Sequence, residues 1–286
     1  MRREIRSDCP LKRGGVLMLA ALVVAATFVS SFGATGKGQS ANSLTPLQLE
    51  IEKQRQRLSS TEVEERRDAL MRLGALNRAE ASRVAIPALS DFAPIVRATA
   101  VSALAALPAE EGASALMPLL DDKDEFLRQQ VCYALGATRS RMAVNRLVER
   151  LNRDKFDSVR AAAAVALGRI GDEAAVVPLA DVLAGKSSSA AAAKKRKPEK
   201  NEFVLRAAAH SLGEIGSRAG VPILIATLAQ VSAAGDVRRE AANSLGMIGD
   251  PAGIPALQAA TVETDAYLSH IATEALRKIA AKSGRR

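Results

Sequence analysis

Residues 237–257 read VRREAANSLGMIGDPAGIPAL, and this stretch decides the fold. Four of its small or apolar residues follow one another in steps of four, four and three: Val237, Ala241, Leu245 and Ile248. Such steps place side chains on one face of an α-helix. Gly249 can end that helix, Asp250 can cap the next one, and residues 254–260 supply a second apolar segment. The stretch therefore predicts a helical hairpin.

The leucine of this hairpin recurs along the chain in the same setting. The corresponding residues, called the register leucines below, are Leu73, Leu104, Leu135, Leu167, Leu212, Leu245 and Leu276. Successive register leucines are 31, 31, 32, 45, 33 and 31 residues apart, so one interval carries an insertion. We therefore predict an all-α solenoid of about six helical hairpins plus a terminal helix, over residues 62–281.

A glycine directly follows most of the register leucines. These glycines are Gly74, Gly136, Gly168, Gly213 and Gly246. A glycine inside a helix costs about 1 kcal/mol relative to alanine. Because apolar periodicity continues past each glycine, we interpret it as a place of close helix approach and not as a helix end. The low aromatic content of 3% and the absence of Trp also suit closely packed helices.

A second clear copy of the hairpin begins at residues 159–172, which read VRAAAAVALGRIGD. Together with residues 237–257 it resembles the short HEAT-like repeat that is also found in phycobilisome lyases. The resemblance implies a right-handed α-α superhelix. Because repeats of this kind serve scaffolds, adaptors and a few enzymes alike, it does not decide the function. A lyase-like enzyme or a pigment chaperone is an alternative by family analogy.

The first 33 residues have the layout of an export signal. Lys12 and Arg13 precede an uncharged, mainly apolar stretch over residues 16–32, and small residues follow. Its length lies between that of a usual signal core and a membrane span, so residues 1–33 are either a signal peptide or an N-terminal membrane anchor. We expect the rest of the chain to be periplasmic or extracellular, or tethered to the membrane, in a bacterium. Residues 34–61 are expected to form a linker and a capping helix.

The net charge of +9 lies outside the repeats. Residues 1–33, residues 186–200 and the basic tail 282–286 carry more than this excess, which leaves the rest of the chain slightly acidic. A basic isoelectric point therefore does not make the repeats a nucleic-acid-binding surface.

The longest interval between register leucines contains the basic insertion at residues 186–200. Its composition is typical of a solvated, disordered loop. The other interpretation is an electrostatic contact with an anionic surface, and its candidate contact residues are Lys194, Lys195, Arg196 and Lys197. No aromatic residue alternates with these charges, as stacking on single-stranded nucleic acid would require. We therefore do not expect nucleic acid as the partner.

An arginine recurs seven residues before the register leucine. The set is Arg66, Arg97, Arg128, Arg160 and Arg238. These arginines can line up as a stripe for phosphates or as a structural ladder. The HEAT-like resemblance favours the ladder, in which the arginine pairs with an acidic residue of the turn. We expect the partners to lie two to four residues upstream, at Asp124, Asp157 and Asp236.

Histidine and cysteine are too scarce to indicate a catalytic or metal site. Neither His210 nor His270 is followed by Glu, so the His-Glu iron ligands of some HEAT-like hydroxylases are missing from the sequence. Cys132 aligns with small apolar residues of the other repeats and is predicted to be a buried filler. No nucleophile–base arrangement or phosphate-binding glycine loop is recognised. We expect no catalytic residue, no metal and no cofactor.

These patterns together favour a non-catalytic scaffold that binds a protein partner through an extended repeat surface. On the third hairpin, Arg146, Glu149 and Arg150 are candidate partner contacts because the pattern places them towards solvent. The alternatives are anionic-surface or nucleic-acid binding through residues 186–200, and the lyase-like activity named above.

Overall fold

The computed structural model describes residues 44–185 and 199–283. The expected export segment 1–33, the basic residues Lys194 to Lys197 and the last three residues of the basic tail lie outside the described residues. From Leu44 onward the chain forms one compact unit. Its described residues contain helices and connecting turns and no strand.

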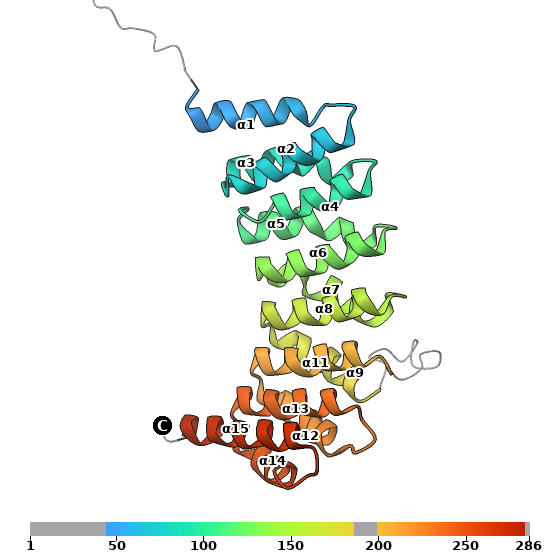
Figure 1. Cartoon of the computed structure of the whole chain (residues 1–286), viewed down its shortest axis with the longest axis vertical. Coiled ribbons are helices and arrows are strands. Elements are labelled where there is room, and N and C mark those ends of the chain that lie inside the picture. The colour runs from blue at the N-terminus through green and yellow to red at the C-terminus, as the bar shows by residue number, and fades with distance from the viewer. Residues whose placement is uncertain (1–43, 186–198, 284–286) are drawn as a thin grey trace, which may run out of the picture. The chain divides into compact units, whose positions relative to one another are not determined.

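The helices alternate between two layers (Figure 1). The first helices of the hairpins, together with the terminal helix, are α2 (Val63–Ala75), α4 (Pro94–Ala103), α6 (Glu125–Thr138), α8 (Asp157–Ile170), α11 (Glu202–Ile215), α13 (Gly235–Ile248) and α15 (Ala266–Ser283). The second helices are α3 (Ala79–Ala85), α5 (Ala109–Leu116), α7 (Val144–Arg153), α9 (Val176–Leu183), α12 (Val221–Ala229) and α14 (Ile254–Ala260). The predicted six hairpins and terminal helix are confirmed.

Short 3-10 helices accompany every second helix. They are η1 (Ile86–Ser90), η2 (Met117–Asp121), η3 (Arg141–Ala143), η4 (Glu173–Ala175), η5 (Arg218–Gly220) and η6 (Pro251–Gly253). Asp172 and Asp250 cap η4 and η6, because their carboxylates accept the N–H groups of Ala174 and Ala252 at 2.9 Å. The predicted cap at Asp250, and the equivalent cap at Asp172, therefore act one short turn before the second helix begins. A further helix, α1 (Pro46–Arg57), packs on the first hairpin.

The register leucines form the centre of the core. The first six are buried, and Leu135 and Leu167 are closed to solvent altogether. Leu276 of α15 is only half-buried. A repeat buries its apolar face against the next one, and α15 is followed by no further described helix, so its leucine is covered from one side.

The glycines after the register leucines set the distance between successive first helices. A Cβ atom added at Gly136 would lie 2.8 Å from Cα of Ala166 in α8, and one added at Gly168 would lie 2.8 Å from Cα of Ser211 in α11. Cβ atoms added at Gly213 and Gly246 would meet Ser244 and Ala275 as closely, whereas one added at Gly74 would lie 3.3 Å from Cα of Ala103. The predicted close approach is confirmed, since a side chain would collide with the next helix at four of the five glycines and would be tightly packed at Gly74.

The joint between α4 and α6 departs from this arrangement. Ala105 occupies the position of the glycine, and α4 already ends at Ala103. The N–H of Leu107 donates to the carbonyl oxygen of Leu104 at 3.0 Å, so the chain turns where the other first helices continue. The two helices therefore meet less closely at their carboxyl ends than their neighbours do.

Candidate functional site

The five recurring arginines, Arg66, Arg97, Arg128, Arg160 and Arg238, are called the ladder arginines below. Each lies near the start of a first helix and joins two consecutive turns. Nη1 of Arg128 donates to the carbonyl oxygen of Asp122 at 2.8 Å, in the turn before α6. Its Nε and Nη2 donate to the Asp154 carboxylate at 2.8 and 2.9 Å, in the turn before α8. Such a two-point contact fixes both the distance and the orientation of its partners. Arg128 therefore ties one turn of the stack to the next.

The same arrangement recurs along the array. The pairs are Arg66–Asp91, Arg97–Asp122, Arg128–Asp154, Arg160–Glu199 and Arg238–Glu263. All of these arginines except the half-buried Arg160 are buried. Their guanidinium groups already bind carboxylates, so they do not form a stripe that is open to phosphate groups. The structural ladder, and not the ligand stripe, is confirmed.

The predicted positions of the acidic partners were largely wrong. The main partners lie in the following turn, 25 or 26 residues downstream for four of the arginines and 39 residues downstream for Arg160, across the insertion. Asp124 instead caps α6 by accepting a backbone N–H, and Asp236 pairs with Arg239. Arg160 does contact the upstream Asp157 at 2.7 Å. The reason is geometric: the arginine side chain extends along the stack, whereas the upstream carboxylates lie where they can cap their own helix.

Two described helices lack the ladder arginine: the terminal α15, where Ser269 occupies its register position, and α11 within the array. Leu205 of α11 occupies the register position of the arginine, and Gln230 stands 25 residues later. The arginine and its acidic partner are therefore missing together. A lone buried arginine or carboxylate would be costly, so the two residue types are expected to occur as a unit.

The ladder shifts the acid–base behaviour of its carboxylates. Burial by itself would raise the pKa of Asp154. Hydrogen bonds from Arg128 and a backbone N–H, with the charges of Arg128 and Arg150, nevertheless hold that pKa below its ordinary value. The pKa of Asp91 is lowered in the same way, chiefly by its hydrogen bond from Arg66, against the opposing effect of burial. Both carboxyls are therefore ionised and paired at neutral pH.

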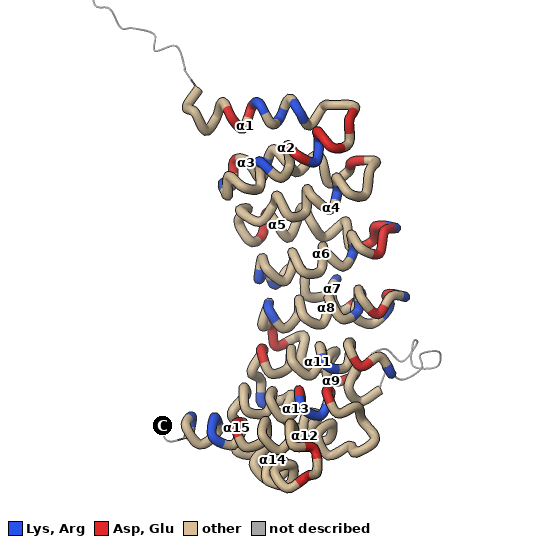
Figure 2. Tube along the Cα trace, in the orientation of Figure 1, with Lys and Arg blue, Asp and Glu red and all other residues tan. Residues whose placement is uncertain are grey.

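The connections from each second helix to the next first helix lie along one edge of the array, which we call the turn edge (Figure 1). It comprises residues 58–64, 90–95, 121–126, 153–157, 199–203, 230–236 and 261–267. Acidic and basic residues gather there together (Figure 2). Of the twelve large apolar side chains exposed among the described residues, seven lie on the turn edge: Phe92, Ile95, Phe126, Phe203, Val231, Val262 and Tyr267. The turn edge therefore carries most of the exposed large apolar side chains of the described residues, together with charged residues.

Aromatic residues are concentrated on the turn edge although the chain has few of them. The Arg66 guanidinium lies 4.6 Å from the ring centroid of Phe92, so this ring covers part of the ladder. Phe126, Phe203 and Tyr267 each stand nine residues before a register leucine and are 54%, 67% and 74% exposed. Sequence reasoning missed this set, although its common register was visible in the sequence.

The predicted partner contacts Arg146, Glu149 and Arg150 lie together on α7. Nη1 of Arg150 donates to the carbonyl oxygen of Leu120 at 3.3 Å and lies 3.4 Å from the carboxylate of Asp121. Arg146 also pairs with Asp121, and its Nε lies 3.5 Å from Glu149. The structure thus brings the three residues into one charged cluster with the preceding hairpin. Arg146 and Glu149 stay half-exposed, whereas Arg150 is largely enclosed.

The described cysteine and histidine residues lie on three different helices: Cys132 on α6, His210 on α11 and His270 on α15. Cys132 is buried as predicted, and burial raises the pKa of its thiol to about 12. Nδ1 of His210 lies 2.9 Å from the Glu240 carboxylate on the helix surface, while His270 is exposed. Within residues 44–185 and 199–283, no three His, Cys, Asp or Glu side chains are arranged to hold a metal ion.

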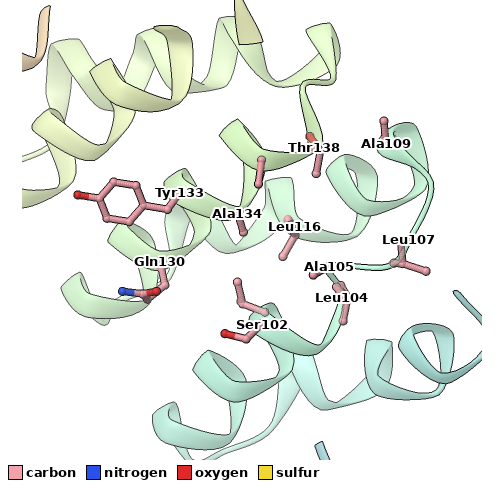
Figure 3. A pocket seen from close by; sticks show the side chains of 12 residues that line it. Ser102, Leu104, Ala105, Leu107, Ala109, Leu116, Gln130, Tyr133, Ala134 and Thr138 are labelled. Carbon is pink, nitrogen blue, oxygen red and sulfur yellow. The ribbon is translucent and has the colours of Figure 1, made fainter. Parts of the chain in front are cut away.

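A cleft of about 450 Å³ opens at the irregular joint between α4 and α6 (Figure 3). Its buried apolar residues are Val101, Leu104, Leu107 and Leu116. Gln130 and Tyr133 lie at one end of the cleft, and Leu107 and Ala109 lie at the other (Figure 3). Its volume falls within the range of ligand pockets in proteins, roughly 300–1,000 Å³. Sequence reasoning missed the cleft, for which the replacement of the usual glycine by Ala105 was the available signal.

The HEAT-repeat family profile matches residues 51–136, 113–195 and 194–277. No curated protein matches the sequence. Among solved structures, an engineered protein is 21% identical, with a TM-score of 0.50, over 80% of this chain and 68% of its own. At this identity the similarity shows a shared fold.

Two natural proteins are also similar. The complex of CpcE and CpcF of phycocyanin lyase from Nostoc sp. PCC7120 is 20% identical, with a TM-score of 0.49, over 90% of this chain and 98% of that chain. Human deoxyhypusine hydroxylase is 22% identical, with a TM-score of 0.42, over 81% of this chain and 84% of that chain.

Proposed function

The chain belongs to the HEAT-repeat family, and from this premise we propose that it is a non-catalytic scaffold, exported or membrane-tethered, that binds a protein partner along its turn edge. The observation that carries the proposal is the gathering of exposed apolar side chains there. Exposed apolar side chains that gather within a polar border are typical of protein interaction sites. Aromatic residues are also enriched among the side chains that contribute most to binding.

The fold supports this role by holding the exposed rings at fixed places. The ladder pairs join consecutive turns, and the glycine joints fix the separation of the first helices. Phe126 and Phe203 stand on the first turns of α6 and α11 and so inherit that spacing. A surface that is ordered before binding loses less conformational entropy when a partner docks.

Export or tethering rests on residues 1–33. Their basic start and apolar stretch support an export signal or an anchor. Within the part of the chain that the structure describes, no helix has the length and apolar character needed to span a bilayer. On this proposal, a membrane attachment of the scaffold would be made by residues 1–33.

Chemical cross-linking of native cell envelopes, followed by capture of the full chain, tests the proposal. The edge variant Phe126→Ser with Phe203→Ser is expected to recover the partner at least about tenfold less than the wild type, because it removes two large exposed rings. The matched control is Met71→Ser with Val177→Ser, which removes exposed apolar side chains away from the turn edge. Equal recovery by all three proteins would refute binding through the turn edge.

Deletion of residues 186–198, which keeps the ladder residue Glu199 in place, provides the arm for the electrostatic alternative. We expect the deleted chain to recover the partner as the wild type does, with a weak dependence on salt. If the deletion abolishes all binding, and wild-type binding falls steeply as the salt concentration rises, the result would favour an anionic surface as the partner.

A further inference from the structure

The cleft between α4 and α6 arises from one local departure from the repeat. At the regular joints a glycine lies against a small residue of the next first helix. Here Ala105 replaces that glycine, and the last turn of α4 is missing. Leu104 and Leu107 therefore face a space of about 450 Å³ and not a neighbouring helix backbone.

The lining of the cleft selects an uncharged occupant. None of its twelve lining residues carries a charge. Val101, Leu104 and Leu116 are nearly closed to solvent and form an apolar floor. A charged group placed on such a floor would lose its hydration without gaining a partner, which is strongly unfavourable. An apolar group placed there would be removed from water at a gain that grows with its buried area.

The rim of the cleft offers hydrogen-bonding groups that are still free. The side chains of Ser102, Gln130 and Tyr133 make no hydrogen bond with any described residue. The Gln130 amide combines a donor and an acceptor, which are the two groups that a backbone peptide unit presents. Thr138 differs from these three, because its hydroxyl already donates to the carbonyl oxygen of Leu135 at 2.7 Å.

We propose that this cleft receives an uncharged apolar side chain, of the size of Leu or Phe, from an extended segment of the protein partner, and that Gln130 binds the backbone of that segment. The inference rests on the proposed function and names a second contact point for the same partner. The shape of the cleft favours a polypeptide over a free small molecule. Ser102, Ala105 and Ala109 are exposed, so the cleft covers its occupant from one side. Pockets for small molecules usually bury about 70–90% of the ligand surface.

Methyl NMR of the full chain tests the inference. The probes are N-acetyl-leucine N-methylamide and N-acetyl-phenylalanine N-methylamide, which carry one apolar side chain between two peptide units. N-acetyl-aspartate N-methylamide is the charged control probe, and toluene represents a free apolar molecule. We expect the two apolar peptide probes to shift the methyl signals of Ala105, Ala134 and Thr138 in a saturable way, and the charged probe to leave them unchanged.

Two variants show whether the shifts come from the cleft. Ala134→Leu fills the cleft and is expected to abolish them. Ala207→Leu, the same change at a half-buried alanine of α11, should not affect them. Gln130→Ala leaves the apolar floor intact and is expected to weaken the peptide probes roughly 3- to 10-fold while leaving toluene unaffected. This second variant keeps the test decisive if Ala134→Leu does not fold.

Three results would overturn the inference. The first is that the apolar peptide probes leave the cleft methyl groups unchanged. The second is that these probes bind Ala134→Leu as well as they bind wild type. The third is that toluene saturates the cleft while the peptide probes do not. The envelope capture separates this inference from the scaffold proposal. If Ala134→Leu recovers the partner as fully as wild type does, the cleft is not a partner contact although the scaffold proposal stands. If the probes bind the cleft but wild type recovers no partner, the scaffold proposal fails and the side-chain preference of the cleft stands.

Discussion

Arg128 and Asp154 form the most enclosed pair of the ladder, and their side chains are only 7% and 2% exposed. Removal of one member of a buried pair leaves the other charge without its partner. Asp121, by contrast, pairs with Arg146 at the surface and is 56% exposed. The two aspartates therefore allow buried and exposed ion pairs to be compared within one chain.

We expect Asp154→Ala to lower the free energy of unfolding by about 3 kcal/mol. Asp121→Ala should change it by less than about 1 kcal/mol, because solvent screens the exposed pair. Urea unfolding followed by circular dichroism measures both. Equal losses for the two variants would show that the buried ladder pair holds the turns together no more strongly than an exposed ion pair does.

The lowered pKa values of Asp154 and Asp91 predict a loss of stability in acid. A carboxyl whose pKa is lower in the folded chain stabilises the fold above its unfolded pKa of about 4, and this contribution is lost as the pH falls through the folded value. Wild type should therefore lose thermal stability more steeply below about pH 4 than Asp154→Asn does. Parallel pH profiles of the melting temperature would contradict this.

At the scale of the elements, the first helices are positioned by the contact of a glycine with a small residue. Gly136→Ala would place a Cβ atom 2.8 Å from Cα of Ala166. Gly112 is the matched control in α5, since a Cβ atom there would meet its nearest neighbour, Cγ2 of Thr138, at an ordinary 3.5 Å.

Gly136→Ala is expected to lower the free energy of unfolding by about 1–3 kcal/mol through overpacking, despite the better helix propensity of alanine. Gly112→Ala should be neutral or stabilising by up to about 1 kcal/mol. Thermal unfolding of the two variants decides the matter. Stabilisation by Gly136→Ala would mean that the helices do not approach as closely as the structure shows.

The hairpins could be predicted from the sequence because their evidence is local and repeated: apolar steps of four and three, a glycine, and a turn. The acidic partner of Arg128 could not be found in the same way, because it lies 26 residues downstream and is close only in the stack. The cleft was missed for another reason. The replacement of the recurring glycine by Ala105 is a small change in the sequence. Its effect is that the close contact between α4 and α6 does not form.

At the scale of the whole array, each repeat stabilises its neighbours, so damage to one repeat should spread. Leu167 is fully buried in α8, and Leu167→Ala is expected to cost about 2–5 kcal/mol. Hydrogen exchange should become faster in α6 and α11 as well as in α8. The control Leu276→Ala, in the half-buried terminal copy, should have a smaller effect that stays within α13, α14 and α15. Faster exchange confined to α8 in the Leu167 variant would contradict the nearest-neighbour account.

The central claim is that a protein partner binds along the turn edge, and site-specific photo-cross-linking in native envelopes tests it most directly. A photoreactive residue is placed singly at Phe92, Phe126, Phe203 or Tyr267 on the turn edge. The control positions are the exposed residues Ala219 and Ala252, which lie in the turns between a first helix and its own second helix. We predict one common cross-linked protein from the turn-edge positions and none from the two controls. Cross-linking of that protein from the controls alone, or equally from all six positions, would contradict the account.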